Sequence, residues 1–211
     1  MSKELTVEQG TPEWFAARLG IATASRFKDI MARTPAPRNN YSAELVAERL
    51  TGEREESYKS NDMQWGNDYE AVARLTYKLN NHDKKVRDCG IFLHEKIDCG
   101  ASPDGLVDDD GTIEIKCPKT ATHIQTLKSG KLPTQYYWQV QGQLWMTGRK
   151  WCDFISYDPR LPENASYICI RVECDEEAIS RLAESVESFM KQVASDTELL
   201  KGYNPVRLER V

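Results

Sequence analysis

Three charged residues in the middle of the chain have the types and spacing of a metal-dependent hydrolytic site. Asp104 lies in a Ser-Pro-Asp-Gly turn, and the run Glu114-Ile115-Lys116 follows after a second turn. Side chains alternate along a strand, so Glu114 and Lys116 share one face while Ile115 points into a core. Two converging carboxylates suit a hard divalent cation, and a lysine beside them can hold or deprotonate an attacking water. The pattern predicts a metal-dependent nuclease core.

Each half of this pattern also has an ordinary explanation. Aspartate is common in Pro-Asp-Gly turns because its side chain bonds to nearby backbone, and Glu-x-Lys pairs are common on exposed strands. One hairpin would nevertheless bring the two halves side by side, and the apolar residues Ile113 and Ile115 indicate that the second strand is buried. A buried glutamate and lysine need a reason, so the combination favours the functional interpretation.

Length and composition suit one compact domain. The chain has 211 residues, of which 40% are hydrophobic, and neither a repeat nor a linker divides it. We therefore predict a single nuclease domain over residues 1–211. The six cysteines lie scattered without a Cys-x-x-Cys pair, and we expect them to be reduced core residues. The three histidines are not at ligand spacing, which favours oxygen ligands for the metal.

The distribution of charge bears on location and partners. No stretch approaches the roughly 20 apolar residues that cross a bilayer, and the first residues lack the apolar run of a signal peptide, so we expect a cytoplasmic protein without a membrane partner. The net charge of −5 is unusual for a protein that binds nucleic acid. Basic residues gather over 18–38 and 116–131, however, so a local basic track is compatible with the overall charge.

The expected elements change from helices to strands along the chain. Thr11 and Pro12 begin a first helix that Gly20 ends, and Thr23 or Ser25 caps a second. We expect residues 34–40, which include two prolines, to form a polar, mobile loop. Further helices are predicted over 42–50, 62–79, 121–129, 134–146 and 175–200, and strands over 90–94, 99–107, 112–117, 152–157 and 167–172. These elements indicate an α/β fold with a mixed sheet flanked by helices.

An ordered set of motifs resembles a known family. Together they are similar to the phage lambda-type alkaline exonucleases, viral recombinases with a restriction-endonuclease-like PD-(D/E)xK core. The resemblance spans most of the chain and is only general after residue 165. The motifs are Trp14-x-x-x-Arg18-Leu19-Gly20, Thr23-Ala24-Ser25, Trp65-Gly66-x-x-x-Glu70, Ser102-Pro103-Asp104-Gly105-Leu106, Glu114-Ile115-Lys116-Cys117-Pro118, Gln139-x-Gln141 and Tyr157-Asp158-Pro159-Arg160.

The resemblance implies a role for each residue of the core. Asp104, Glu114 and the backbone carbonyl of Ile115 would bind divalent metal, with Glu70 contributing to a second metal position. The metal would be Mg²⁺, for which Mn²⁺ can substitute. Lys116 would handle the nucleophilic water. Gln139, which matches an additional glutamine of the family's active site, would help to position that water or the lysine.

Three further residues match positions that contact DNA in the family, and a fourth, Arg38, lies in a segment that has no exact match there. Arg18 and Ser25 would hold a terminal 5′ phosphate, which arginine can bind with two parallel hydrogen bonds. Each also has a structural alternative, since Ser25 could be a plain helix cap and Arg18 a surface charge. Met63 stands where the family has an apolar wedge that separates the strands, and Arg38 would help to steer them.

The function that the resemblance implies is exonucleolytic. We expect Mg²⁺-dependent 5′-to-3′ digestion of linear double-stranded DNA, which releases 5′-mononucleotides and leaves 3′ single-stranded overhangs for recombination. The family further implies a homotrimeric ring, a single-strand annealing partner, and a phage or prophage gene expressed in a bacterial cytoplasm. The alternatives are a structure- or sequence-specific endonuclease with the same core and a non-catalytic module that binds DNA ends. A calcium-binding turn is a weaker alternative, because the 12-residue spacing of a calcium loop is absent.

Overall fold

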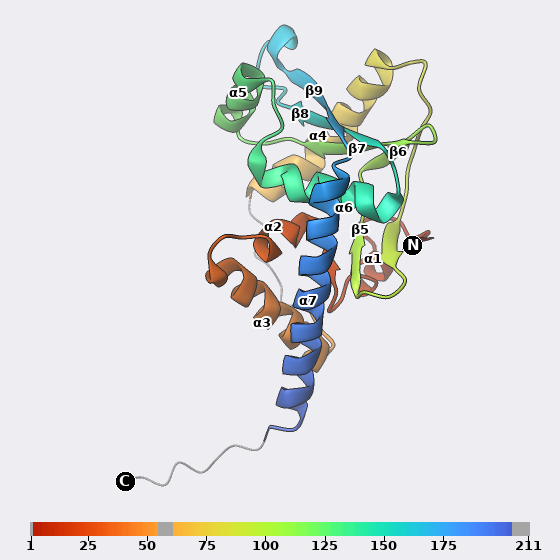
Figure 1. Cartoon of the computed structure of the whole chain (residues 1–211). Coiled ribbons are helices and arrows are strands. Elements are labelled where there is room, and N and C mark those ends of the chain that lie inside the picture. The colour runs from red at the N-terminus through yellow and green to blue at the C-terminus, as the bar shows by residue number, and fades with distance from the viewer. Residues whose placement is uncertain (1, 55–60, 204–211) are drawn as a thin grey trace.

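The computed structural model describes residues 2–54 and 61–203, which form an α/β fold of helices around two mixed sheets (Figure 1). The fold class therefore agrees with the expected one. In chain order the elements are β1 (Ser2–Leu5), α1 (Pro12–Ala16), β2 (Ala22–Thr23), η1 (Ala24–Arg26), α2 (Phe27–Ile30), α3 (Pro35–Thr51), α4 (Asn61–Asn80), β3 (Val86–Arg87), β4 (Ile91–His94), β5 (Cys99–Ala101), β6 (Gly105–Val107), β7 (Gly111–Lys116), α5 (Thr120–Ser129), η2 (Thr134–Tyr136), α6 (Tyr137–Thr147), β8 (Trp151–Tyr157), η3 (Glu163–Ala165), β9 (Tyr167–Glu173) and α7 (Glu176–Lys201).

The described strands form two sheets where the sequence predicts one. Their orders are β1-β4-β5-β2 and β3-β6-β7-β8-β9. The single strand predicted over 99–107 is divided, because β5 belongs to the first sheet and β6 to the second. In the second sheet β6 and β7 form the expected antiparallel hairpin, with Gly105 opposite Ile113, and β7 runs parallel to β8. Asp104 therefore lies where the chain passes from one sheet to the other.

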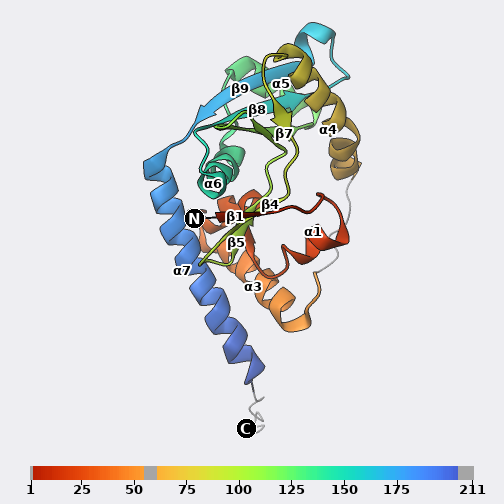
Figure 2. The same ribbon diagram turned by 90° about the vertical axis from the view of Figure 1, so that its right-hand side faces the viewer.

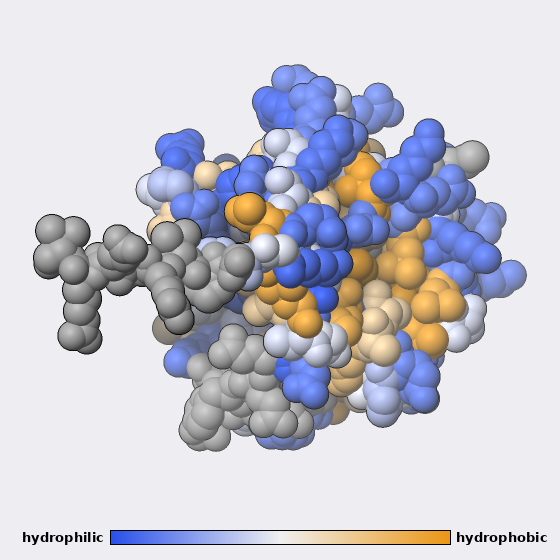
Figure 3. Space-filling view, turned by 90° about the horizontal axis from the view of Figure 1, so that it is seen from below, coloured by the Kyte–Doolittle hydropathy of each residue, from blue (hydrophilic) through white to orange (hydrophobic). Residues whose placement is uncertain are grey.

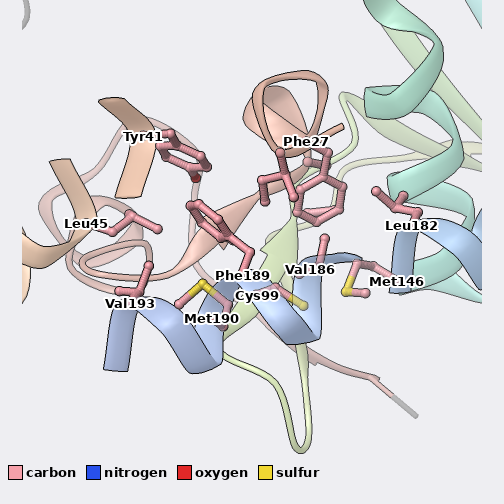
Figure 4. Packing of buried hydrophobic residues seen from close by; sticks show 14 of the residues in the cluster. Phe27, Tyr41, Leu45, Cys99, Met146, Leu182, Val186, Phe189, Met190 and Val193 are labelled. Atoms are coloured by element: carbon pink, nitrogen blue, oxygen red, sulfur yellow. The ribbon is translucent and has the colours of Figure 1, made fainter. Parts of the chain in front are cut away.

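Helices α6 and α7 connect the two sheets. Helix α6 lies between them, and α7 runs along the length of the molecule beside both (Figure 2). The side chain of Asp175 caps α7 by accepting a hydrogen bond from the amide of Ala178 at 2.9 Å. The apolar face of α7 is buried against α2 and α3, where Phe189 stacks on Tyr41 with ring centroids 5.4 Å apart (Figure 4). This core fixes the helical half of the molecule against the sheets.

The predicted loop over 34–40 is wrong, because α3 begins at Pro35. Pro35 and Pro37 both lie in the first turn of the helix, where backbone N–H groups have no intrahelical acceptor and proline loses nothing. Helix α3 then continues to Thr51 and ends at Gly52, whose φ of +73° is the left-handed conformation that glycine adopts without strain. Arg38 is thus a residue of the first helical turns rather than of a mobile segment.

Other boundaries also differ from the expected ones. Helix α1 has the predicted Thr11 cap but ends at Ala16, before Gly20. The second predicted helix is divided into η1 and α2, and neither has a side-chain cap. The cysteines of the described chain are free, yet Cys169 is exposed, so the expectation of core cysteines is wrong there. None of the described helices is both long and apolar enough to cross a membrane.

Candidate active site

The hairpin of β6 and β7 positions the two central carboxylates. The backbone amide of Asp104 donates to the carbonyl of Ile113 at 3.1 Å, and its side-chain Oδ2 accepts from the amide of Ile115 at 2.6 Å. Asp104 is therefore fixed at both its backbone and its side chain to the strand that carries Glu114. An added Cβ at Gly105 would lie 3.0 Å from Arg74 and 3.1 Å from Ile113, which explains why glycine follows the aspartate.

Glu114 lies at the centre of a cluster of hydrogen-bond donors. Its side chain is 1% exposed, and its Oε1 accepts from Lys116 Nζ and from Gln139 Nε2. Its Oε2 accepts from Gln143 Nε2. Gln139 and Gln143 are four residues apart on α6 and so project from the same face of that helix. The predicted residues Asp104, Glu114, Lys116 and Gln139 are thus brought together.

The electrostatics of the site show a concentration of negative charge. Burial, together with the charges of Glu114 and Glu70, raises the pKa of Asp104 well above its ordinary value. Burial also raises the pKa of Glu70, and the charge of Glu114 adds to the rise. Burial disfavours the charged form of Lys116, but the carboxylates of Glu114 and Asp104 outweigh it and raise the pKa of that lysine. The three carboxylates are therefore close enough to repel one another.

The donor set fits a hard divalent cation that keeps several of its waters. No three carboxylate, histidine or cysteine side chains of residues 2–54 and 61–203 meet as an all-protein metal cage. Mg²⁺ does not need one, because it is commonly held by one or two carboxylates with water and substrate oxygens completing the shell. Asp104 and Glu114 supply those carboxylates, and a cation between them would relieve the repulsion that helps to raise the pKa of Asp104.

A pocket of about 430 Å³ opens beside these residues. The guanidinium of Arg160 lies 4.2 Å from the ring of Trp65 and is held by Asp158 through Nε at 2.7 Å. Beside one carboxylate, the pocket thus presents cations and aromatic rings, which are groups that contact the phosphates and bases of nucleic acids. Its lining is Trp65, Gly66, Glu70, Ile115, Lys116, Cys117, Pro118, Lys119, Tyr136 and Arg160.

Two residues of the site were not predicted from the sequence. Gln143 is one, although its spacing of four from Gln139 on an amphipathic helix was a usable signal. Arg74 is the other. It donates to the backbone carbonyl of Asp104 and to Asp88 at 2.8 Å, and lies 4.0 Å from Glu70 on the preceding turn of α4. Arg74 thereby links the Glu70 helix to the Asp104 turn.

Arg18 lines a separate cavity of about 930 Å³ next to α3. Its guanidinium lies 4.1 Å from the ring of Trp14, whose Nε1 donates to Ser102 at 2.9 Å, two residues before Asp104. Its Nε is buried and has no hydrogen-bond partner in the described chain, and burial lowers its pKa to about 10. Arg18 is therefore not the surface charge of the structural alternative.

Ser25 is exposed in η1 beside this cavity. Its Oγ lies 3.3 Å from Oγ1 of Thr23, which itself lines the cavity, and it forms no helix cap. The alternative explanation of Ser25 as a plain cap is therefore wrong. The structure places Arg18 and Ser25 near each other through Thr23, but apart from the pocket that contains Lys116.

Arg38, one of the two remaining predicted residues, is not brought into either place. Arg38 donates to the carbonyl of Ile30 at 3.2 Å and lies 5.0 Å from the ring of Phe189. It borders a cavity of about 580 Å³ between α3 and α7. Seen from below, the surface of the molecule shows apolar residues among hydrophilic ones (Figure 3). Met63 belongs to the first turn of α4, and its side chain lies outside the described structure.

Comparisons with known proteins agree with this fold. The YqaJ-like viral recombinase domain family matches residues 13–150. The chain therefore belongs to the YqaJ-like viral recombinase family. None of the curated proteins compared with the chain matches it.

Solved structures give the same assignment in more detail. The chain is 47% identical to LHK-Exo, an alkaline exonuclease from Laribacter hongkongensis, with a TM-score of 0.86 over 90% of this chain and 96% of that one. The complex of LHK-Exo with dAMP gives a TM-score of 0.87 at the same identity and coverage. A phage-related exonuclease from Haemophilus somnus 129PT shares the fold, with 15% identity and a TM-score of 0.65 over 86% of this chain and 95% of that one. The expected likeness to the lambda-type alkaline exonucleases is confirmed.

Proposed function

We propose that this protein is a Mg²⁺-dependent 5′-to-3′ exonuclease that acts on linear double-stranded DNA. It would release 5′-mononucleotides and leave 3′ single-stranded overhangs. The observation that carries the proposal is the convergence of Asp104, Glu114, Lys116 and Gln139 on one hairpin and one helix face. Membership in the YqaJ-like family and the 47% identity to an alkaline exonuclease that binds dAMP support it.

The residues present fit a two-metal site. Asp104, Glu114 and the Ile115 carbonyl would hold one Mg²⁺, and Glu70 would contribute to a second position. Bound metal would supply positive charge to the attacking and leaving oxygens of the phosphodiester. Mn²⁺ would substitute, because its ligand preferences are similar.

The protein's own groups would carry the remaining tasks. Lys116, partly exposed toward the pocket and held in its charged form by the neighbouring carboxylates, would hold and orient the attacking water. Gln139 would hold Glu114 and Lys116 in their relative positions, since its side-chain amide donates to Oε1 of Glu114, which also accepts from Lys116. Arg18 and Ser25 would bind the terminal 5′ phosphate, for which the buried Nε of Arg18 is an available donor. These roles divide the site into a cutting centre and an end-binding cavity.

The proposal includes an assembly and a partner. We propose a homotrimeric ring, in which an acidic protein can turn its basic residues toward an enclosed channel. A single-strand annealing protein would load onto the exposed 3′ strand, in the cytoplasm of a bacterial host that carries the phage or prophage. Sedimentation velocity of the full chain should give the mass of three copies, and a monomer would remove the ring from the proposal.

The direct test compares substrates rather than variants. Linear duplex with 5′-phosphate or 5′-hydroxyl ends and closed circular duplex are each incubated with Mg²⁺ and with EDTA. We expect loss of the 5′ strand from phosphorylated linear DNA only, and only with Mg²⁺. Nicking of the circle would instead identify a structure- or sequence-specific endonuclease. Binding of ends without any release of nucleotides would identify a non-catalytic module.

A further inference from the structure

The two carboxylate oxygens of Glu114 have different hydrogen-bond donors. Its Oε1 contacts Lys116, which lines the pocket, while its Oε2 contacts only Gln143 among the hydrogen bonds of the described chain. Gln143 does not line the pocket and is 1% exposed. The carboxylate therefore has one oxygen on the side of the reacting groups and one on the protein side, and Gln143 is the donor on the protein side.

A neighbouring glutamine on the same helix shows that burial alone does not demand this contact. Gln141 is also 1% exposed, but both ends of its amide bond to backbone. Its Nε2 donates to the carbonyl of Glu173 at 3.0 Å, and its Oε1 accepts from the amide of Asp175 at 2.9 Å. Gln141 thus joins α6 to the start of α7 and has no contact with the carboxylates.

The amide of Gln143 is satisfied at one end only. Its Nε2 donates to Glu114, whereas its Oε1 is buried and has no hydrogen-bond partner in the described chain. A buried carbonyl without a hydrogen-bond partner lowers the free energy of unfolding. Gln143 therefore destabilises the fold at its Oε1 while its N–H group donates to Glu114. A well-packed apolar side chain at this position would give the folded protein a higher stability.

A neutral donor is the appropriate partner for a carboxylate that must bind a cation. Lys116 already contacts Oε1, and a second cationic side chain on Oε2 would compete further with the metal ion for Glu114, whereas an amide donates a hydrogen bond without adding charge. A donor on Oε2 also fixes the rotation of the carboxylate, so that Oε1 faces Lys116. Without that donor, the carboxylate of Glu114 would be free to turn away from the orientation in which it binds a cation, and the affinity for the cation would fall.

We propose that Gln143 is a positioning residue of the metal site, which orients the carboxylate of Glu114 through its Oε2 oxygen. The inference rests on the proposed metal-dependent function, and Gln143 acts only through Glu114. It predicts an effect on the affinity for divalent cations rather than on the chemical step itself.

The test measures cation binding directly in the full chain. Mn²⁺ is titrated into wild type, Gln143→Met and Gln141→Met, and free Mn²⁺ is followed by electron paramagnetic resonance. Methionine retains length and helix propensity but removes the amide. We expect the dissociation constant for Mn²⁺ to rise about 10- to 100-fold in Gln143→Met, which is the usual cost of removing a residue that orients a metal ligand. Gln141→Met should bind Mn²⁺ as wild type does.

Thermal unfolding and nucleotide release separate positioning from structure. Gln141→Met should lose at least as much stability as Gln143→Met, because it breaks two hydrogen bonds instead of one. The half-saturating Mg²⁺ concentration for nucleotide release should rise in Gln143→Met by the same factor as the Mn²⁺ dissociation constant. If Gln143→Met does not fold, Gln143→Asn retains the amide but shortens its reach, and the same rise in the Mn²⁺ dissociation constant is expected.

The outcomes distinguish this inference from the proposed function. Wild-type Mn²⁺ affinity in a folded Gln143 variant would overturn the positioning role and leave the proposed function intact. An equal loss of affinity in Gln141→Met would also overturn it, because the effect would then be general loosening of α6. Wild type that neither binds Mn²⁺ nor releases nucleotides would overturn both proposals.

Discussion

At the scale of single residues, the indole of Trp14 connects the proposed cutting centre with the cavity proposed to bind DNA ends. Trp14 lies against the Arg18 guanidinium at 4.1 Å and donates to Ser102 at 2.9 Å, next to the Asp104 turn. A 5′ phosphate held by Arg18 would thereby have a fixed relation to the scissile bond. Catalysis by such a site depends largely on this kind of positioning.

Arg18→Lys should remove the preference for phosphorylated ends. Lysine keeps the charge but cannot place two parallel donors on one phosphate. We expect the ratio of initial rates on 5′-phosphate and 5′-hydroxyl duplex to fall about tenfold, the effect of losing one hydrogen bond to a charged group. Arg181→Lys is the matched control, because Arg181 is exposed on α7 and pairs with Glu177. An unchanged ratio in Arg18→Lys would argue against the phosphate role.

Asp153 gives a prediction about acid stability. Burial alone would raise its pKa, but hydrogen bonds from Arg171 and Tyr77 outweigh burial and hold the pKa below its ordinary value of 3.8. A carboxyl whose pKa is lower in the folded chain stabilises the fold above the ordinary value, and that stabilisation is lost as pH falls through the folded pKa. The Asp153 network should therefore support the fold at neutral pH and fail in acid.

Asp153→Asn should lower the free energy of unfolding at pH 7 by about 3 kcal/mol, as breaking a buried ion pair does. The gap to wild type should narrow below about pH 4, where the carboxyl of Asp153 becomes protonated first in the unfolded chain and then, at lower pH, in the folded chain. Urea unfolding of both proteins between pH 3 and pH 7 measures this difference in the free energy of unfolding. Asp110→Asn should change little, because Asp110 and Lys150 form an exposed pair at 3.5 Å. A gap that is constant across this pH range would contradict the assignment.

At the scale of elements, α6 can reach the hairpin of β6 and β7 because the neighbouring face of the helix, which contains Gly142, packs closely on η1 and α2. A Cβ at Gly142 would lie 2.5 Å from the ring of Phe27 and 3.3 Å from Cβ of Ala24. Phe27 is fully buried and has no room to move aside. The absence of a side chain at Gly142 therefore sets how closely the helix with Gln139 and Gln143 approaches the rest of the core.

Gly142→Ala should destabilise the protein by about 1–3 kcal/mol, the range for overpacking a core, despite the better helix propensity of alanine. Gly66→Ala in α4 is the control, because a Cβ there has nothing within 4 Å and should be neutral or stabilising. Chemical denaturation of the two variants gives the comparison. Equal stability of both variants would show that the approach of α6 is not set by this contact.

The sequence predicts an element correctly when a local pattern of residues determines it, and fails when contacts with distant segments do. The β6–β7 hairpin and α7 follow from local alternation and periodicity, and both are confirmed. The loop over 34–40 was wrong because prolines that end a helix in its interior are tolerated in its first turn. Strands β2 and β3 are two residues long and exist only through their pairing partners, so no local pattern marks them.

The same distinction holds for the site. Asp104, Glu114 and Lys116 lie within one hairpin, so spacing alone brings them together. Gln143 and Arg74 act through contacts between elements distant in sequence, 29 and 30 residues from their partners. Gln141, part of a motif shared with the family, proves to bond backbone at the start of α7. Long-range packing therefore decides which glutamine of α6 reaches the carboxylates.

At the scale of the whole molecule, the two candidate sites lie in different parts of the fold. The pocket with Lys116 is built by the second sheet and α4, whereas the cavity with Arg18 is built by α3 and the segment after α1. The net charge of −5 means that DNA binding must depend on these local groups. The account therefore centres on one claim, that the hairpin carboxylates and their lysine cut DNA with the help of a divalent cation.

The measurement that tests this claim most directly is nucleotide release from 5′-phosphorylated linear duplex by wild type, Glu114→Ala and Lys116→Ala, with Mg²⁺ and with EDTA. The account predicts release by wild type with Mg²⁺ only, and a loss of at least about a thousandfold in both variants, which still fold and bind DNA ends. Lys191→Ala, which alters an exposed pair with Glu187 on α7, should cut as wild type does. Cleavage by either site variant at the wild-type rate, or undiminished cleavage in EDTA, would contradict it.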